Sequence, residues 1–173
     1  MLKSIARHLV NRAEKRIGVE LDYAHQIAKT DFGLMSRYGK IFGFLDPNKN
    51  VPPLAYHAAR IRGAAAADCG TCIEAEVNLA KASGIDAKLI KALLLKDYAE
   101  LPEDISAVAR LADAVVLNCE DAPEARAEVQ QAFGNAGLIE ICYAMNGAAL
   151  LPGIKRAMGY ATQCNLPLLS GKL

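Results

Sequence analysis

The motif Cys69-Gly-Thr-Cys72 is the part of the chain most suited to redox chemistry. Asp68 precedes it and is a favourable N-cap residue, so we expect both cysteines in the first turn of a helix. Free N–H groups and the dipole at the start of a helix stabilise a thiolate. This argument favours Cys69 as the more acidic thiol. The i, i+3 spacing brings the two Cβ atoms to ~5–6 Å, so a small adjustment of the turn would allow a reversible disulfide.

Two ionisable residues are predicted to lie beside these thiols. Glu76 follows Cys72 by about one helical turn and therefore lies on the same face of the helix. His57 lies on the preceding helix, and an antiparallel pair folded about Ala66 and Ala67 places it opposite Glu76. An imidazole oriented by a carboxylate beside a thiol can generate a thiolate near neutral pH. We therefore expect His57 to accept a proton from Cys72, directly or through one water, while Glu76 orients the imidazole.

Each of these residues also has a plainer interpretation. A lone C-x-x-C can be half of a zinc site, but zinc takes four ligands, and the sequence holds no second C-x-x-C and no H-x₃-H. A site shared between subunits would still fit the motif. His57 can be a packing histidine, and Glu76 a solvated acid. The redox interpretation is favoured because the predicted helix pair brings all of them into one register.

The other cysteines are isolated in apolar stretches and are interpreted as small buried hydrophobic residues. They are Cys119, Cys142 and Cys164. An odd total of five cysteines without a secretion signal is not the pattern of a disulfide framework.

The composition predicts an all-α protein. The 173 residues include 31 Ala and 21 Leu, whereas Val, Ile and Thr together number 23, and this balance favours helices over strands. A net charge of +1 gives no electrostatic case for nucleic-acid binding. No apolar run approaches the ~20 residues that span a bilayer, and the N-terminus lacks a signal-peptide core. We expect a cytoplasmic protein with no membrane partner, no cofactor and no metal ion.

A loop rich in Pro and Asn at 46–53 is the clearest boundary in the chain. It divides the sequence into an N-terminal helical arm, 1–50, and a helical domain, 51–173. Hydrophobic periodicity and breakers predict the individual helices. They are 1–18, 20–29 and 31–45 in the arm, and 53–67, 69–83, 87–96, one starting near 101, 121–133, 136–151 and 154–162 in the domain.

The first helix is amphipathic, with a stripe that includes Leu2, Ile5 and Leu9 and a basic opposite face. Such a helix can be a transit peptide or a membrane-surface anchor. Packing on its own protein or on a neighbouring subunit is favoured, because the stripe lacks the Trp and Phe anchors of interfacial helices.

The region 51–160 resembles the carboxymuconolactone decarboxylase-like family, and more closely its alkylhydroperoxidase D branch. That branch carries E-x₁₁-C-x₂-C-x₃-H on two consecutive helices. In this chain the two cysteines match, but His57 occupies the family's Glu position and Glu76 its His position. The acid and the imidazole are thus exchanged between the helices. The resemblance rests on Tyr56-His57, Cys69-Gly-Thr-Cys72-Ile-Glu-Ala-Glu76 and Ala80-Lys-Ala-Ser-Gly84.

This resemblance implies an all-α helical bundle, assembled as a homo-oligomer such as a trimer or hexamer. It implies that Cys72 attacks a hydroperoxide and that Cys69 resolves the product as an intramolecular disulfide. It also implies an external dithiol reductant, such as a dihydrolipoyl protein. Lactone decarboxylases of the family lack the C-x-x-C, so decarboxylation is not expected. The resemblance and the dipole argument differ on the attacking thiol, and Cys72 is preferred because it is predicted to be nearer His57 and more enclosed.

The sequence therefore predicts a thiol-dependent antioxidant enzyme that reduces hydroperoxides through Cys69 and Cys72. One alternative is a dithiol redox switch or disulfide oxidoreductase that acts on a partner protein. Another is a non-catalytic zinc-binding or subunit-binding module. Turnover of a hydroperoxide with a dithiol separates the first from the second, and a metal assay tests the third.

Overall fold

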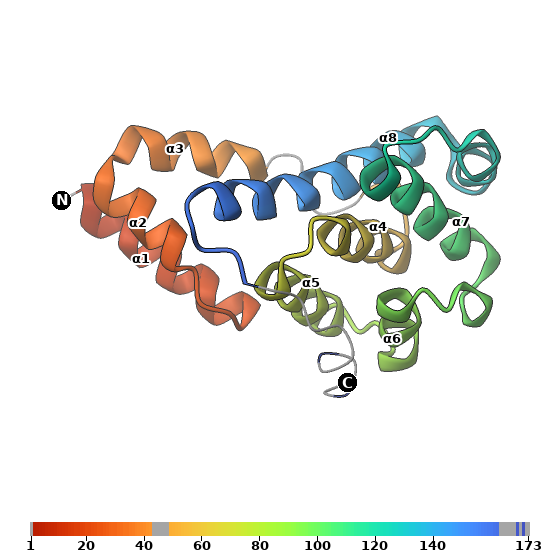
Figure 1. Cartoon of the computed structure of the whole chain (residues 1–173), viewed down its shortest axis with the longest axis horizontal. Helices are drawn as coiled ribbons and strands as arrows, with labels where there is room; N and C mark the ends of the chain where they lie inside the picture. Colours follow the sequence, from red (N-terminus) through yellow and green to blue (C-terminus); the bar gives the residue numbers. More distant parts are fainter. Residues whose placement is uncertain (1, 43–48, 163–168, 170, 172–173) are drawn as a thin grey trace.

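The computed structural model describes residues 2–42, 49–162, 169 and 171, and within these ranges the chain is helical with no strand. The all-α prediction is confirmed for this part of the chain. Figure 1 shows the three helices of the arm gathered at one end and α6 and α7 at the other, with α4 and α5 between them. The α-helices are α1 (Leu2–Ile17), α2 (Asp22–Thr30), α3 (Phe32–Ile41), α4 (Pro53–Ala66), α5 (Gly70–Ala82), α6 (Ala87–Leu95), α7 (Glu103–Ala112) and α8 (Pro123–Ala157). Two short helices, η2 (Tyr98–Glu100) and the π-helix η3 (Asp113–Asn118), flank α7.

Helix α4 is the centre of the core. Its residues from Ala55 to Ala64 are buried, and it packs against α5, α7 and α8. A Cβ atom added at Gly63 would lie 2.1 Å from the carbonyl oxygen of Met145. This closeness requires glycine, since any side chain at Gly63 would meet the backbone of α8. The close crossing of α4 and α8 fixes the end of α8 relative to the turn that follows α4.

Helix α8 forms the longest side of the core and is interrupted at Gly134, whose φ of 69° and ψ of −178° are non-helical. The predicted end of a helix at Phe133-Gly134 is confirmed. Pro152 was expected to break or kink the helix, and it does not break it: the helix continues through this buried proline to Ala157. Length and composition would allow α8 to cross a membrane, which for a single helix with buried residues is weak evidence.

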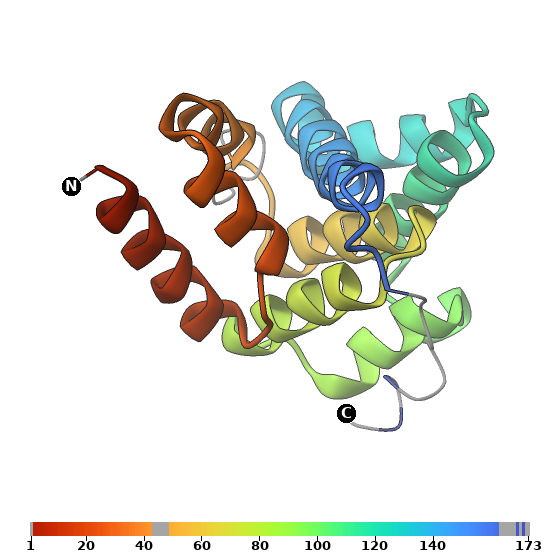
Figure 2. The ribbon, with the colours of Figure 1, turned by 60° about the vertical axis from the view of Figure 1, so that its left-hand side comes forward.

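The predicted helix over 154–162 is present only to Ala157, as the end of α8, and the chain then turns back. Gly159 has a φ of 82°, and the segment from there to Thr162 is not helical. A backbone hydrogen bond of 3.2 Å joins the N–H of Gly70 to the carbonyl oxygen of Thr162. The segment therefore returns to the beginning of α5 (Figure 2).

The arm has a small core of its own, formed by Val10, Tyr23, Ala24 and Tyr38. Leu151, Met158 and Tyr160 of the helical domain pack against it. The side chain of Asn78 in α5 also donates a 2.9 Å hydrogen bond to the carbonyl oxygen of Ile17. The arm thus lies against α5 and the end of α8.

The buried side of α1 differs from the predicted stripe. Ala6 and Val10 are buried, whereas Ile5 and Leu9 remain 52% and 56% exposed. The reason is that α2 and α3 cover only the strip of α1 that carries the smaller side chains. The side chain of Leu2 lies outside the described residues.

The isolated cysteines are not all buried as predicted. Cys119 is exposed, because it ends η3 in the left-handed conformation, with a φ of 59°. Cys142 is half-buried, and burial raises the pKa of its thiol. Cys164 lies outside the described residues. The C-x-x-C motif is therefore the structural feature that brings two thiols together.

Candidate dithiol site

The turn between α4 and α5 positions the two thiols. Asp68 has a left-handed φ of 47°, and Cys69 has the extended conformation of an N-cap residue, with φ −127° and ψ 103°. The prediction that Asp68 caps the helix is wrong, because an N-cap residue needs the extended backbone that Cys69 adopts. Cys72 lies in the first turn of α5, and Cys69 lies just before it. Both thiols are free.

The two thiols share one proton. A hydrogen bond from the Cys72 thiol is the main cause that lowers the pKa of Cys69 to about 5, with further lowering by the Cys72 backbone N–H, Lys155 and the Thr162 backbone N–H, against the opposing effect of burial. The same hydrogen bond and burial raise the pKa of Cys72. At neutral pH the pair therefore carries one negative charge, on Cys69. This agrees with the sequence argument that favoured Cys69 as the more acidic thiol.

Access to the two sulfur atoms differs. Cys69 is completely buried, and Cys72 is half-buried. The prediction that Cys72 is the more enclosed thiol is wrong, because the segment that follows α8 covers Cys69. Thr162 accepts hydrogen bonds from the N–H groups of Gly70 and Thr71, each 3.2 Å long. The accessible thiol and the acidic thiol are thus two different residues.

The turn beneath Cys69 is tied to α8 by Arg156. Its Nη2 atom donates hydrogen bonds to the carbonyl oxygens of Ala67, at 2.8 Å, and Asp68, at 2.7 Å. These two carbonyl groups lie in the turn between α4 and α5, just before the motif, and belong to neither helix. Arg156 therefore satisfies two exposed acceptors and holds the turn that presents the cysteines.

Lys155 supplies the positive charge at the site. This residue of α8 is only 5% exposed, and its charge lowers the pKa of both cysteines. Its Nζ atom lies 5.8 Å from the centre of the Tyr23 ring, a cation–π contact with the arm. Within the described ranges no hydrogen bond or ion pair joins this ammonium group to an acceptor oxygen. Lys155 is a buried cation whose negative neighbour is the thiol pair.

The arm closes this side of the site with two tyrosines. The hydroxyl groups of Tyr23 and Tyr38 are 2.6 Å apart, and their rings meet edge to face. Burial is the main cause that raises the pKa of Tyr23 to about 12 and also raises that of Tyr38. Both tyrosines are therefore neutral near pH 7. They give Lys155 an aromatic surface and no counter-charge.

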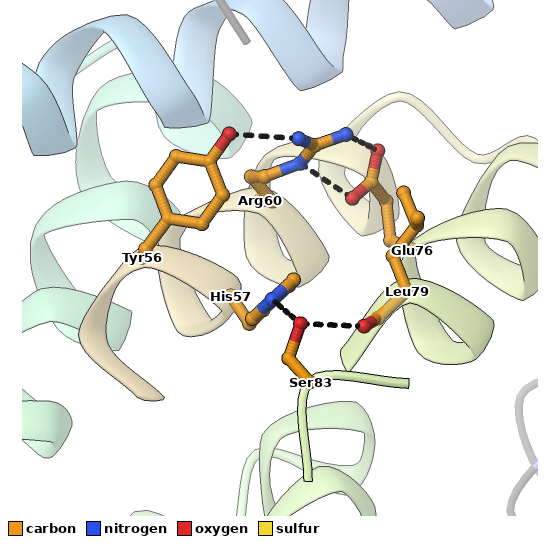
Figure 3. Close-up of polar contacts among 6 residues, drawn as sticks. All are labelled: Tyr56, His57, Arg60, Glu76, Leu79 and Ser83. Atoms are coloured by element: carbon orange, nitrogen blue, oxygen red, sulfur yellow. Dashed lines mark hydrogen bonds and ion pairs between the residues drawn. The ribbon is translucent and has the colours of Figure 1, made fainter. Parts of the chain in front are cut away.

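Glu76 lies on the predicted face of α5, but its partner is Arg60. The guanidinium group donates to both carboxylate oxygens, with Nε–Oε2 at 2.6 Å and Nη2–Oε1 at 2.8 Å, and both residues are buried. Arg60 also donates from Nη1 to the hydroxyl group of Tyr56, at 2.8 Å. Figure 3 shows these three side chains in one row of contacts. We refer to Tyr56, Arg60 and Glu76 as the arginine cluster.

His57 points to a different partner. Its Nε2 atom is 2.8 Å from the hydroxyl oxygen of Ser83, and that hydroxyl group donates to the carbonyl oxygen of Leu79 (Figure 3). Because the Ser83 proton is used in this way, Nε2 of His57 is the donor. Its Nδ1 atom is buried without a partner. Burial, and then the charge of Arg60, lower the pKa of His57 to about 4, so the ring is neutral at pH 7.

The predicted pairing of His57 with Glu76 is therefore wrong. The turn is centred near Asp68 and not between Ala66 and Ala67, so Glu76 faces a residue one turn further along α4. His57 is displaced towards the far end of α5, away from the motif. Cys72 and Glu76 do lie in the first two turns of α5, just after the N-cap residue Cys69, and the charge of Glu76 contributes to the raised pKa of Cys72.

A pocket of about 350 Å³ lies between the arm and the helical domain, beside the start of α5. It shares Lys155 and Thr162 with the surroundings of Cys69. Its lining also includes Thr71 and Glu74, on either side of Cys72 in the sequence. The full lining is Gly18, Val19, Glu20, Asp22, Thr71, Glu74, Lys155, Tyr160 and Thr162.

Two residues of this site carried too weak a signal for sequence analysis. Lys155, with Arg156, was part of only a looser match to the family in the later stretch of the chain, and nothing local connects it to a motif far away in the sequence. Arg60 follows Tyr56 by four residues on the same face of α4, so a correct centre for the turn would have identified it as the partner of Glu76.

No group of three His, Cys, Asp or Glu side chains suited to a metal ion occurs in the described part of the chain. Comparisons with protein-family models, with curated proteins and with solved structures gave no match. Residue chemistry and geometry therefore carry the functional inference.

Proposed function

We propose that this protein is a thiol-dependent oxidoreductase that reduces hydroperoxides through Cys69 and Cys72. The observation that carries the proposal is the pair of free cysteines at the start of α5, one turn apart and near the buried Lys155; the lowered pKa of Cys69 agrees with it. Thiolates are the nucleophiles of thiol chemistry, and an ordinary cysteine is mostly protonated at pH 7. This pair holds a thiolate at neutral pH.

The proposed reaction uses the two thiols in sequence. Cys72, the accessible residue, passes its proton to the Cys69 thiolate, and its own thiolate attacks the outer oxygen of the hydroperoxide. An S–O bond forms, the O–O bond breaks, and the alkoxide leaves and takes up a proton. Cys69 then attacks the sulfur of the Cys72 sulfenic acid, forms the disulfide and releases water. Two thiols are oxidised while one hydroperoxide becomes an alcohol and water, and an external dithiol, such as a dihydrolipoyl protein, restores the thiols.

In this scheme the base for Cys72 is Cys69 and not His57. The two sulfur atoms already share a hydrogen bond, which is the path for the proton. His57 donates to Ser83, and its free Nδ1 atom is enclosed near the far end of α5. The exchange of acid and imidazole relative to the alkylhydroperoxidase D branch thus corresponds to a different proton relay.

Access favours a small substrate over a partner protein. Cys69 is completely buried and Cys72 only half-buried, while a pocket of about 350 Å³ lies beside the motif. Direct exchange with a protein disulfide needs a sulfur atom that the partner can reach in line. A hydroperoxide needs only a path for a small molecule.

We further propose a cytoplasmic homo-oligomer whose helical domain is a bundle of the alkylhydroperoxidase D type. Ile139 and Leu150, one face of α8, are 52% and 48% exposed, which is unusual for large apolar side chains on a core helix. Light scattering should give a mass above one chain at micromolar concentration, and Ile139→Glu with Leu150→Glu should reduce it. A monomeric mass for the wild type would contradict this proposal.

The function is tested by hydroperoxide consumption with dihydrolipoamide as reductant. Wild type should turn over, while Cys69→Ser and Cys72→Ser should each lose turnover. Cys69→Ser should form a sulfenic acid that a dimedone probe traps at Cys72, more slowly than wild type because the base for Cys72 is missing. Cys142→Ser, which changes a half-buried thiol outside the motif, is the matched control and should retain turnover. No consumption by wild type, or equal consumption by the Cys72 variant, would overturn the proposal.

A further inference from the structure

The pocket between the arm and the helical domain contains an unusual polar group at its inner side. Lys155 is only 5% exposed, yet it lines the pocket. Burying an ammonium group is costly unless acceptors replace the lost water. Among the described residues its neighbours are the Tyr23 ring and the negative charge of the thiol pair. Its N–H groups therefore have capacity for an acceptor that enters the pocket.

The same lysine lies within the electrostatic reach of both thiols. It lowers the pKa of Cys69 and of Cys72, and the pocket wall includes Thr71 and Glu74, the neighbours of Cys72 along α5. Thr162, which covers Cys69, is also part of the wall. Neither cysteine is itself a lining residue, so Thr71 and Thr162, which are hydrogen-bonded to each other at 2.9 Å, are what place the pocket next to the motif.

We propose that this pocket is the hydroperoxide site and that Lys155 is a catalytic residue, whose ammonium group binds the substrate oxygen and stabilises the alkoxide that leaves. The proposal rests on the proposed function and adds the residue that completes it. When the S–O bond forms and the O–O bond breaks, negative charge develops on the leaving oxygen. A fixed positive charge aimed at that position lowers the barrier, and removing one such donor typically costs about 10²–10³-fold in rate.

The charges at the mouth of the pocket point to the substrate class. Glu20, Asp22 and Glu74 line it together with the single cation Lys155, and the first two are exposed at its opening. Carboxylates at the mouth repel an anionic substrate before it reaches the lysine. The pocket therefore favours hydrogen peroxide and small neutral alkyl hydroperoxides over fatty-acid hydroperoxides.

The test of Lys155 separates an effect on the leaving oxygen from an effect on the thiolate. For the full chain, the rate constants for hydrogen peroxide and for iodoacetamide are measured at Cys72 between about pH 5 and 9. Both reagents need the same thiolate, so their ratio is independent of the fraction that is ionised. Iodoacetamide releases iodide and needs no oxygen stabilisation, so only the peroxide depends on a donor for oxygen.

Lys155→Met should lower the peroxide-to-iodoacetamide ratio by at least tenfold, whereas Lys155→Arg should retain most of it. Lys91→Met removes an exposed lysine of α6 and is the matched control, with an unchanged ratio. Circular dichroism checks that each variant is folded. If the methionine variant does not fold, the arginine variant still provides the test. An unchanged ratio in a folded Lys155→Met would overturn the catalytic role. Failure of wild type to react with peroxide would instead overturn the proposed function.

The substrate class is tested with the double variant Asp22→Asn, Glu74→Gln. At low ionic strength the rate with an anionic fatty-acid hydroperoxide should rise several-fold, and the rate with tert-butyl hydroperoxide should stay within twofold of wild type. Equal rates of wild type with the anionic and neutral substrates, or a parallel change in both, would contradict selection at the mouth.

Discussion

The arginine cluster and the dithiol site are neighbours along α5, which carries both Cys72 and Glu76, but their buried charges have different partners. Arg60 and Glu76 are both buried and neutralise each other through two short hydrogen bonds, with Tyr56 completing the guanidinium contacts. Lys155 is equally buried as a residue, but it lines the pocket, its negative neighbour is a thiol pair, and no ion pair joins it to a carboxylate among the described residues. A satisfied cluster indicates a role in stability, and an unsatisfied one indicates a role in chemistry.

This contrast also changes the meaning of Glu76. Sequence analysis placed it at the site as the partner of an active histidine. In the structure its carboxylate is occupied by Arg60, and no proton transfer needs it. The comparison predicts that changes in the arginine cluster alter the free energy of unfolding, whereas changes at Lys155 alter the reactivity of the thiols.

The largest expected effect follows from breaking the buried ion pair. Glu76→Gln leaves the Arg60 charge buried without its partner and should lower the free energy of unfolding by about 3–5 kcal/mol. Urea denaturation measures this loss. The double variant Arg60→Met, Glu76→Met should recover much of it. A Glu76→Gln protein that keeps its stability but loses thiol reactivity would show that the cluster belongs to the chemistry.

A smaller effect is expected from His57. Its pKa is about 4 in the folded chain and near 6.5 when unfolded, so the unfolded state binds the proton first as the pH falls. The contribution of the neutral His57 ring to the free energy of unfolding is fully present above pH 6.5 and is lost progressively as the pH falls to about 4. This term amounts to up to about 3 kcal/mol. Denaturation at several pH values should show the decline, and His57→Gln should flatten it between those limits.

If the decline in this pH range were identical in wild type and His57→Gln, the buried imidazole would not be its source. A large change in the thiol reactivity of His57→Gln would restore the proton-relay role predicted from sequence. The structure predicts that His57→Gln flattens the decline and leaves thiol reactivity unchanged, because the hydrogen bond of His57 goes to Ser83.

The smallest change in stability is expected at Lys155. Replacing this buried cation with Met removes the positive charge beside the Cys69 thiolate, but the thiolate can take up a proton in response, so the free energy of unfolding should fall much less than in Glu76→Gln. The pKa of Cys69 should nevertheless rise from about 5, because the lysine charge is one cause of its lowering. A loss of stability as large as that of Glu76→Gln would contradict the contrast between the two regions.

Much of the fold was predictable because alanine-rich periodic segments and strong breakers identify helices locally. Asp86 was predicted to cap α6 and does so, accepting a 2.7 Å hydrogen bond from the N–H of Lys88. Gly134 was predicted as the end of a helix and is the interruption in α8. Pro152 was misleading, since the helix continues through this buried residue to Ala157 despite the local cost of a proline.

The candidate site was predictable only in its local part. The spacing of Cys69, Cys72 and Glu76 within one helix defines a common face, and this face is present. Partners from other helices depend on where the turn between the helices is centred. Sequence analysis misplaced this centre by about two residues and therefore chose His57 in place of Arg60 as the partner of Glu76. Lys155 comes from a helix far away in the sequence, and its approach depends on the close crossing of α4 and α8 at Gly63, which local periodicity cannot reveal.

The central claim is that Cys69 and Cys72 share one proton and present a thiolate at neutral pH, and thiolate absorbance near 240 nm tests it directly. Between about pH 4 and 8 the wild type should gain one thiolate per chain, with a pKa of about 5. Cys69→Ala should lose this transition, and Cys72→Ala should move it towards the ordinary ~8.5 of a free cysteine. A wild type in which no thiolate forms below pH 8 would contradict the account.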